Sequence, residues 1–315
     1  MRDLLTIGET MAAFTAYEKM PLRYAHNFGM RIAGAESNTA MGLAKLGFQS
    51  SWISKVGEDE FGAFIVNQIR SEGVDTSGVV KDNIHSTGVM FKETTASETR
   101  VYYYRENSAA SHMSKEDITE EMIKGFRMVH MSGITPVLSE SCAQLTEEVF
   151  RISKKYNVKI SFDPNIRKKL WKDKCFTEEI KRFTLSANII LIGLDEADVL
   201  FGTKDYQEIL RILFEQGCAE YVGLKDGANG SWVADKERYV KVEPYPCNCV
   251  EPIGAGDAYN SGFIAAVLKG CSLEDIGRMA SVSGALATET TGDIEGYPSK
   301  DAMDHILNCT SEIFR

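Results

Sequence analysis

Short apolar runs alternate along the chain with longer segments in which apolar residues recur every three or four positions. The short runs predict buried strands at residues 4–8, 51–56, 127–132, 158–163, 187–194 and 221–225. The longer segments predict helices at residues 37–47, 61–72, 141–156 and 255–270. Such alternation is typical of an α/β fold with a doubly wound, mostly parallel sheet flanked by helices. Ligands of these sheets bind beyond the carboxyl ends of the strands.

One stretch departs from this alternation. Residues 87–92 and 98–105 are both strand-like, and only residues 93–97 separate them, which predicts a hairpin. Residues 12–32 also read as irregular or extended. We expect segments 12–34 and 85–106 to form a small β-sheet lid over the ligand cleft, within a single domain spanning residues 1–315. A lid suits a site from which water must be excluded.

Composition narrows the classes of partner. The 315 residues are 43% hydrophobic and 25% charged, as in ordinary globular proteins, and the net charge of −10 argues against a nucleic-acid partner. The seven cysteines are scattered, and the close pair Cys247 and Cys249 lacks the further ligands of a zinc site, so a reducing compartment is expected. The N-terminus lacks a signal-peptide pattern, and no apolar run approaches the ~18 residues of a membrane span. We therefore expect a cytoplasmic protein without a membrane partner.

The strongest chemical signal lies where a loop becomes the predicted helix 255–270. Gly254, Ala255 and Gly256 leave backbone N–H groups open to an anion at the start of that helix. Asp257 follows directly and can accept a proton from an attacking hydroxyl. This pattern suits transfer of a phosphoryl group from a nucleotide to an alcohol. The alternative is a tight turn that needs glycine, with Asp257 as a structural acid at a helix start.

The order of two motifs makes the chain resemble the ribokinase-like (PfkB-type) carbohydrate kinases over nearly its whole length. The segment VEPIGAGDAY at residues 250–259 is similar to the family's second signature, and AGAESNTA with LAKLG at residues 33–47 is similar to the first. The resemblance implies a ribokinase-like fold and a catalytic role for the following residues: Asp257 as base, with the amides of Gly254, Ala255 and Gly256 stabilising the transferred phosphoryl group. It also implies that Gly34 and Asn38 face the sugar, although a helix cap or loop brace is the alternative for Asn38.

Further matches concern the nucleotide. The segment LKDGANG at residues 224–230 resembles the family's strand and turn beside the ATP phosphates, for which an ordinary hairpin is the alternative. The resemblance implies ATP contacts from Lys225, Gly227, Gly230, Gly254, Gly256 and, near the adenine, Ser281. The segment GLDE at residues 193–196 is similar to the family's Asn-x-x-Glu, which implies that Glu196 holds Mg²⁺ through water, although Gly193 replaces the asparagine. Glu251 replaces the usual aspartate of the second signature, which leaves a monovalent cation such as K⁺ as an open question.

Two arginines bear on the identity of the alcohol. Tyr103 and Arg105 lie two positions apart on a predicted lid strand and therefore share a face. Arg167 follows the predicted strand 158–163, near the ligand end of the sheet. A guanidinium stays charged and matches a carboxylate, so two arginines at one cleft favour an acidic sugar. The alternatives are surface arginines and an aromatic strand that packs against a dimer partner.

These segments look more like those of 2-keto-3-deoxygluconate kinases than those of fructokinases or ribokinases. That resemblance implies ATP-dependent phosphorylation of the 6-hydroxyl of the sugar acid, which is bound by Gly34, Asn38, Tyr103, Arg105, Arg167 and Asp257. A kinase of neutral sugars or nucleosides and a non-catalytic sugar-binding regulator are the alternatives. A dinucleotide dehydrogenase is the least favoured alternative, because residues 6–10 lack G-x-G-x-x-G after the first strand. We also expect a homo-oligomer through exposed lid strands, and we assign no role to His112 or His130.

Overall fold

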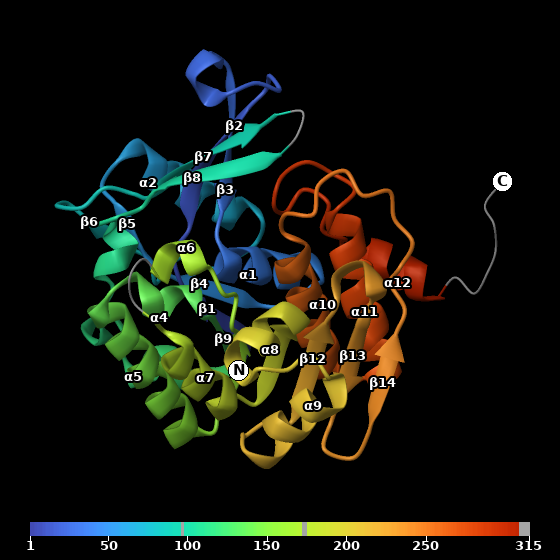
Figure 1. Cartoon of the computed structure of the whole chain (residues 1–315). Coiled ribbons are helices and arrows are strands. Elements are labelled where there is room, and N and C mark those ends of the chain that lie inside the picture. The colour runs from blue at the N-terminus through green and yellow to red at the C-terminus, as the bar shows by residue number, and fades with distance from the viewer. Residues whose placement is uncertain (96–97, 172–174, 309–315) are drawn as a thin grey trace.

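A computed structural model of the chain describes residues 1–95, 98–171 and 175–308. Its main feature is an eight-stranded sheet with the order β14-β13-β12-β11-β10-β9-β1-β4 (Figure 1). In that order the strands are β14 (Tyr239–Val242), β13 (Ser231–Ala234), β12 (Tyr221–Lys225), β11 (Ile189–Gly193), β10 (Lys159–Asp163), β9 (Phe126–Ser132), β1 (Arg2–Ile7) and β4 (Ser50–Ile53). The neighbours from β12 to β4 pair in parallel, whereas β13 and β14 add an antiparallel edge. The predicted α/β class with a mostly parallel sheet is confirmed.

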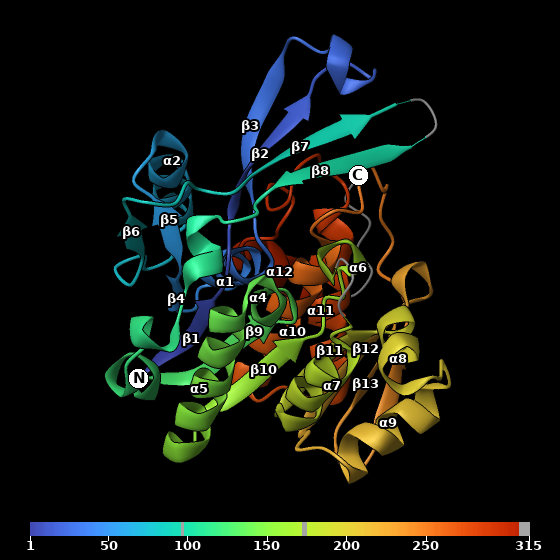
Figure 2. The same ribbon diagram turned by 60° about the vertical axis from the view of Figure 1, so that its left-hand side comes forward.

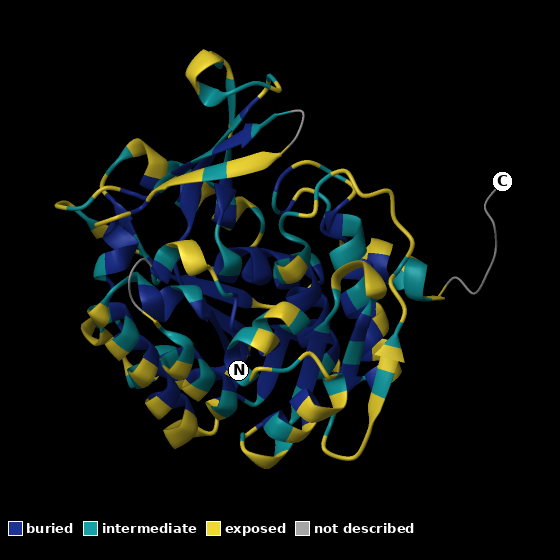
Figure 3. Ribbon diagram, in the orientation of Figure 1, coloured by how far each residue is buried: buried dark blue, intermediate teal, exposed yellow. Residues whose placement is uncertain are grey.

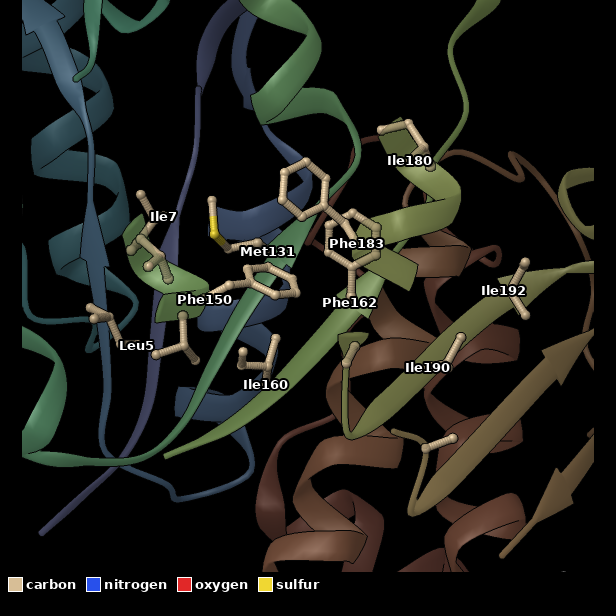
Figure 4. Close-up of a cluster of buried hydrophobic side chains, with 14 of the residues drawn as sticks. Leu5, Ile7, Met131, Phe150, Ile160, Phe162, Ile180, Phe183, Ile190 and Ile192 are labelled. Carbon is tan, nitrogen blue, oxygen red and sulfur yellow. The ribbon is translucent and has the colours of Figure 1, made fainter. Parts of the chain in front are cut away.

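Helices cover both faces of this sheet, which is why its central strands are continuous apolar runs. One face carries α3 (Glu120–Lys124), α4 (Ile134–Leu138), α5 (Glu140–Tyr156), α7 (Thr177–Ser186), α8 (Leu194–Phe201) and α9 (Tyr206–Glu215). Figure 4 shows Phe150 of α5, Phe162 of β10 and Phe183 of α7 meeting in this layer. The rings of Phe150 and Phe183 lie 5.1 Å apart between centroids. Burial of aromatic side chains of this size is a main source of stability in the layer.

The opposite face carries α1 (Ala35–Lys45), α10 (Ala255–Lys269), α11 (Leu273–Ala287) and α12 (Lys300–Asn308). Helix α10 is buried along much of its length, because it lies between the sheet, α1 and α11 (Figure 3). Helix α1 also packs against α10. The starts of α1 and α10, which are more than 200 residues apart in the sequence, are thereby held beside each other.

A second, smaller sheet stands above the body, with the order β3-β2-β7-β8 (Figures 1 and 2). Its strands are β3 (Phe28–Ala33), β2 (Met11–Ala16), β7 (Val89–Thr94) and β8 (Thr99–Tyr104). They fall in the two segments from which the sequence predicted a small sheet, and β7 pairs antiparallel with β8 as a hairpin. Residues 96–97 of the predicted hairpin turn lie outside the described residues.

One predicted strand is wrong in its extent. Residues 51–56 form two strands, β4 and β5 (Lys55–Gly57), which are separated at Ser54. The apolar pattern continues through the break, but the chain leaves the main sheet there and β5 pairs with β6 (Val80–Asp82). The remaining short elements are α2 (Glu60–Ser71), α6 (Lys168–Trp171), η1 (Leu22–Tyr24), η2 (Ala109–His112), η3 (Lys115–Asp117) and η4 (Gly227–Asn229). Within the described ranges, no helix combines the length and apolarity needed to cross a membrane.

Candidate active site

A cavity of about 930 Å³ lies between the small sheet and the body. Met11, Met90 and Tyr103 of the small sheet line one side of it. Asp163 and Lys225, at the carboxyl ends of β10 and β12, line the other. The position matches the general rule for parallel α/β sheets, whose ligands bind at the carboxyl ends of the strands.

The loop before α10 presents an open helix start to this cavity. Gly254 has a φ of +79°, and a Cβ there would lie 2.3 Å from the backbone oxygen of Asp293, so only glycine fits. The Tyr297 hydroxyl donates to the Gly254 carbonyl at 2.9 Å and fixes its orientation. Gly254 and Gly256 both line the cavity, and nothing lies within 4 Å of a Cβ built on Gly256. Ala255 is the first residue of α10, and its N–H donates to the Pro252 carbonyl at 3.4 Å, whereas the N–H groups of Gly256 and Asp257 lie too early in the helix to have an intrahelical partner.

Asp257 lies in the same turn and lines the cavity. Burial raises its pKa to about 7, and the negative charges of Asp163 and Asp293 act in the same direction. The Asn38 side chain opposes this shift by donating its Nδ2–H to Asp257 Oδ2 at 2.9 Å. A carboxylate with a pKa near 7 is a good proton acceptor at neutral pH, because it is partly ionised and sufficiently basic.

Asn38 joins Asp257 to a second carboxylate. Its Nδ2 also donates to Asp293 Oδ2 at 3.2 Å, and the residue is only 1% exposed. Helix α1 has Gly34 at its N-cap position, so the alternative of Asn38 as a helix cap is wrong. Two acceptor carboxylates orient the amide nitrogen, and the buried Oδ1 has no hydrogen-bond partner among the described residues. That oxygen is therefore a buried acceptor with unused hydrogen-bonding capacity, on a residue that lines the cavity.

Asp293 was missed by the sequence analysis, although it lines the cavity. Burial raises its pKa to about 6, while the nearby charge of Lys92 acts in the opposite direction. The only signal of Asp293 in the sequence is the preceding glycine, Gly292. In the structure Gly292 has a φ of +106° and forms a tight turn. That signal is too common to have identified the residue.

Gly34 lies at the start of α1 and lines the cavity beside Asn38. A Cβ on Gly34 would lie 2.5 Å from Thr10 Oγ1 and 2.6 Å from the Glu9 carbonyl. The backbone of the loop after β1 therefore approaches α1 closely at this point, as only glycine permits.

Tyr103 and Arg105 approach the cavity from the small sheet. Arg105 directly follows β8 and forms an ion pair with Glu9, and its guanidinium lies 5.9 Å from the Tyr103 ring. Glu9 was also missed by the sequence analysis; its other carboxylate oxygen accepts the Ser108 hydroxyl at 2.5 Å. The Arg105 Nε is buried and has no hydrogen-bond partner within the described part of the chain. Arg105 is thus held in place by Glu9, and its Nε–H remains unpaired.

Arg167 reaches the same cavity from the opposite side. It follows β10 after a turn in which Asn165 has a φ of +40° and its N–H donates to Asp163 Oδ1 at 3.0 Å. Arg167 is exposed, and its positive charge lowers the pKa of Asp257. The structure therefore brings Arg105 and Arg167 to one cavity.

Lys225 belongs to a buried polar cluster that lies where β10 and β12 end at the cavity. Its Nζ donates to Asp163 Oδ2 at 2.9 Å and to Asn260 Oδ1 at 3.3 Å. Burial works against its charge, but the carboxylates of Asp163 and Glu196 outweigh burial and raise the pKa of Lys225. The ammonium is therefore a permanent positive charge at the end of β12.

Glu196 lies beside this cluster. Its carboxylate accepts the N–H groups of Ile166 and Gly193, both at 2.8 Å. Burial raises its pKa, and the neighbouring charge of Asp163 raises it further, a cost that a bound cation would remove. Within the described ranges, no three His, Cys, Asp or Glu side chains are grouped to hold a metal. An ion at Glu196 would therefore take most of its ligands from phosphate groups and water, as Mg²⁺ commonly does.

Three residues predicted to contact ATP lie outside the lining of this cavity. Gly227 and Gly230 have φ values of +53° and +89° and shape the turn between β12 and β13. Ser281 accepts the Tyr245 N–H at 2.9 Å and donates to the Glu243 carbonyl at 3.2 Å. It thereby holds the segment after β14 against α11.

His112 and His130, to which the sequence analysis assigned no role, are not among the residues that line the cavity. His130 is buried beside Ser161 at 3.0 Å, and burial lowers its pKa to about 4, so it is a neutral core residue. His112 stacks on His85 with 3.6 Å between ring centroids.

Comparison with known proteins agrees with this geometry. Residues 1–300 match the pfkB family carbohydrate kinase. The chain is 33% identical over 310 residues to a 2-dehydro-3-deoxygluconokinase of Bacillus subtilis (97% of this chain, 95% of the relative) and 27% identical over 328 residues to a 5-dehydro-2-deoxygluconokinase of Clostridium perfringens (98% and 94%). A solved sugar kinase of Pyrococcus horikoshii in complex with ATP shares 27% identity and the fold, with a TM-score of 0.83 over 95% of this chain and 96% of that chain. The chain therefore belongs to the pfkB family of carbohydrate kinases and is a phosphotransferase.

Proposed function

We propose that this kinase transfers the γ-phosphoryl group of ATP to the 6-hydroxyl of 2-keto-3-deoxygluconate. The observation that carries the chemistry is Asp257, a carboxylate with a pKa of about 7 in the first turn of α10. A proton acceptor and an open helix start thus share one turn, and phosphoryl transfer needs both next to the acceptor hydroxyl.

The sugar hydroxyl lies at Asp257, which takes its proton as the hydroxyl attacks. Asn38 orients Asp257 through its Nδ2–H, and its unpaired Oδ1 accepts a second hydroxyl of the sugar. The N–H groups at Gly254, Ala255 and Gly256 stabilise the negative charge on the transferred group. General-base catalysis contributes about 10²- to 10⁴-fold, and preorganised N–H donors contribute a comparable factor.

ATP binds with its phosphates between the start of α10 and Lys225, whose charge is held by Asp163. The relative solved with ATP supports this nucleotide. Glu196 would hold Mg²⁺ through water, and the ion would neutralise negative charge on the ATP phosphates. Contacts of Gly227, Gly230 and Ser281 with the nucleotide remain predictions, because these residues lie outside the cavity lining.

The acidic sugar is supported by Arg105 and Arg167, which line one cavity from opposite sides. Arg105 shares its charge with Glu9, so its free Nε and the exposed Arg167 together supply the donors for a carboxylate. The name of the Bacillus relative supports 2-keto-3-deoxygluconate. A second candidate, 5-keto-2-deoxygluconate, is supported by the name of the Clostridium relative and carries the same carboxylate.

We further propose that the small sheet is the lid of a single kinase domain and that it forms a homo-oligomer interface. Its β8 is an edge strand on which Tyr102 and Tyr104 are 39% and 65% exposed. Phe14 and Phe91 stack beside them on the same side of the sheet, with ring centroids 5.1 Å apart. An edge strand with an aromatic surface is suited to pairing with a second copy.

The test is ADP release with MgATP and equal concentrations of 2-keto-3-deoxygluconate, 5-keto-2-deoxygluconate, fructose, ribose and adenosine. The proposal expects clear preference for the first acid, and a phosphorus resonance split by two methylene protons identifies the 6-phosphate. Preference for 5-keto-2-deoxygluconate replaces the substrate but keeps both arginines. Preference for a neutral sugar would show that Arg105 and Arg167 do not bind a substrate carboxylate. Turnover of none of the five contradicts the proposed substrate class.

A further inference from the structure

A buried ion pair connects the small sheet to the loop before α10. Lys92 of β7 pairs with Glu251, and their side chains are only 8% and 15% exposed. Lys92 lies two positions from Met90, which lines the cavity, so both are on the inner face of the sheet. By contrast, the Arg100–Glu98 pair of the same sheet is 55% and 47% exposed. Since burying two charges costs several kcal/mol per ion, the position of the Lys92–Glu251 pair, unlike that of the Arg100–Glu98 pair, needs an explanation.

Glu251 holds together the two loops that frame the open helix start. Its Oε2 accepts the Gly292 N–H at 3.1 Å, and its own N–H donates to the Thr288 carbonyl at 3.0 Å. Gly292 is followed by Asp293, whose backbone oxygen is the atom that a Cβ on Gly254 would strike. A shift of Glu251 would therefore displace both Asp293 and Gly254.

A second cation of the small sheet reaches the other of these loops, which follows α11. The Arg31 Nε of β3 lies 3.0 Å from Glu295, and its Nη2 donates to Thr291 Oγ1 at 3.3 Å. This pair is more exposed than the Lys92 pair, at 36% and 40%. The sheet is thus attached once to each of the two loops, and Lys92 makes the more buried attachment.

We propose that Lys92 is a positioning residue for phosphoryl transfer, whose ion pair with Glu251 fixes the Gly254–Gly256 turn and Asp293 against the small sheet. The proposal rests on the proposed transfer at Asp257. It also answers the open question of a monovalent cation at Glu251, because a side-chain ammonium already neutralises that carboxylate. The position of the Gly254–Gly256 turn then depends on a residue of the small sheet that lies 165 positions before Asp257 in the sequence.

The test compares Lys92→Met, Lys92→Arg and Glu251→Gln with Arg100→Met, which removes the exposed cation of the same sheet. We expect Lys92→Met and Glu251→Gln to lower kcat by about 10-fold or more, since displacement of the catalytic turn by a fraction of an ångström misaligns the reaction. The KM for ATP stays within about threefold, because the Lys225 cluster is untouched. Lys92→Arg keeps the charge and recovers most of kcat, and Arg100→Met matches the parent. A purely structural pair would lower stability and leave kcat of the folded fraction unchanged.

Backbone hydrogen exchange supplies a readout that does not depend on turnover. Lys92→Met should speed exchange of the hydrogen-bonded N–H groups of Gly292, Glu251 and Ala258 by about tenfold or more, with Arg100→Met showing parent rates. Parent-like kcat in Lys92→Met, or unchanged exchange at these amides, overturns the proposal. If the parent phosphorylates none of the sugars, the proposed function fails and the exchange rates alone decide the role of Lys92.

Discussion

The two ends of the cavity are built in different ways. At the end proposed to bind the sugar (the sugar end), charged and polar side chains come from distant segments: Arg105 from beyond β8, Glu9 from the loop after β1, and Asn38 from α1. At the end proposed to bind ATP (the nucleotide end), Lys225 and Asp163 lie at the carboxyl ends of parallel strands in the main sheet. The arrangement of Arg105 therefore depends on how the small sheet sits on the body, whereas the Lys225–Asp163 pair is built by the body alone.

The difference extends to the pKa values. At the sugar end, burial raises the pKa of Asp257 to about 7 and that of Asp293 to about 6, so both groups titrate near neutral pH. At the nucleotide end, neighbouring carboxylates raise the pKa of Lys225 against the effect of burial, so its charge is permanent. One end is suited to moving a proton and the other to holding phosphates.

The largest expected effect separates chemistry from nucleotide binding. Asp257→Asn should lower kcat by about 10³- to 10⁴-fold, because an amide cannot accept the proton of the attacking hydroxyl. The KM for ATP should change by less than about threefold, since the Lys225 cluster is unaffected. Steady-state kinetics with the preferred sugar measure both, with Asp301→Asn, an exposed acid of α12, as control. Near-normal turnover in Asp257→Asn would show that Asp257 is not the catalytic base.

The second-largest effect tests whether Arg105 and Arg167 bind a carboxylate of the sugar. Arg105→Met and Arg167→Met should each raise the KM for the sugar acid by about 10- to 100-fold, the value of one charge-assisted hydrogen bond of about 1.5–3 kcal/mol. Arg105→Met also leaves Glu9 buried without its cation, so the double variant Arg105→Met/Glu9→Gln distinguishes lost contact from that added cost. If the KM stays at the parent value in both single variants, the substrate is bound without these arginines.

Part of this site was predictable because its signal is local. The main-sheet strands are apolar runs, and Gly254 and Asp257 lie within four consecutive residues at a helix start. Asp293 and Glu9 were missed because their function depends on partners far away in the chain. The Asn38–Asp293 hydrogen bond spans 255 residues and the Ser108–Glu9 bond spans 99. The break at Ser54 was missed for a related reason, since a change of partner strand leaves no mark in the apolar pattern.

At the nucleotide end, Lys225→Met should raise the KM for ATP by about tenfold while the KM for the sugar stays within about threefold. The reason is that Lys225 supplies a buried positive charge to the phosphates and makes no contact with the sugar-end residues Asn38 or Arg105. Kinetics with each substrate varied separately measure the two constants. Lys241→Met, an exposed cation of the edge strand β14, is the matched control. An equal rise in both constants would show that the two ends are not independent.

The smallest effect concerns the acid limb of the pH profile. The base must be ionised, so kcat/KM should rise with pH through about 7, the pKa of Asp257. The negative charge of Asp293 raises that pKa, so Asp293→Asn should move the limb to lower pH, by up to about 1 pH unit. Asn38 donates to Asp257 and lowers the same pKa, so Asn38→Leu should move the limb in the opposite direction.

Profiles of kcat/KM between pH 5 and 9 measure these shifts independently of how far each substitution lowers the absolute rate. Opposite displacements would mean that the sugar end sets the basicity of Asp257 through the two groups joined by Asn38. Displacement in the same direction for both variants would contradict that arrangement and would point to solvent exposure of Asp257 as the dominant change. Since burial is the largest cause of the raised pKa, any variant that opens the cavity lowers it. The limb of Asn38→Leu is therefore the more decisive of the two, because only loss of the hydrogen bond moves it to higher pH.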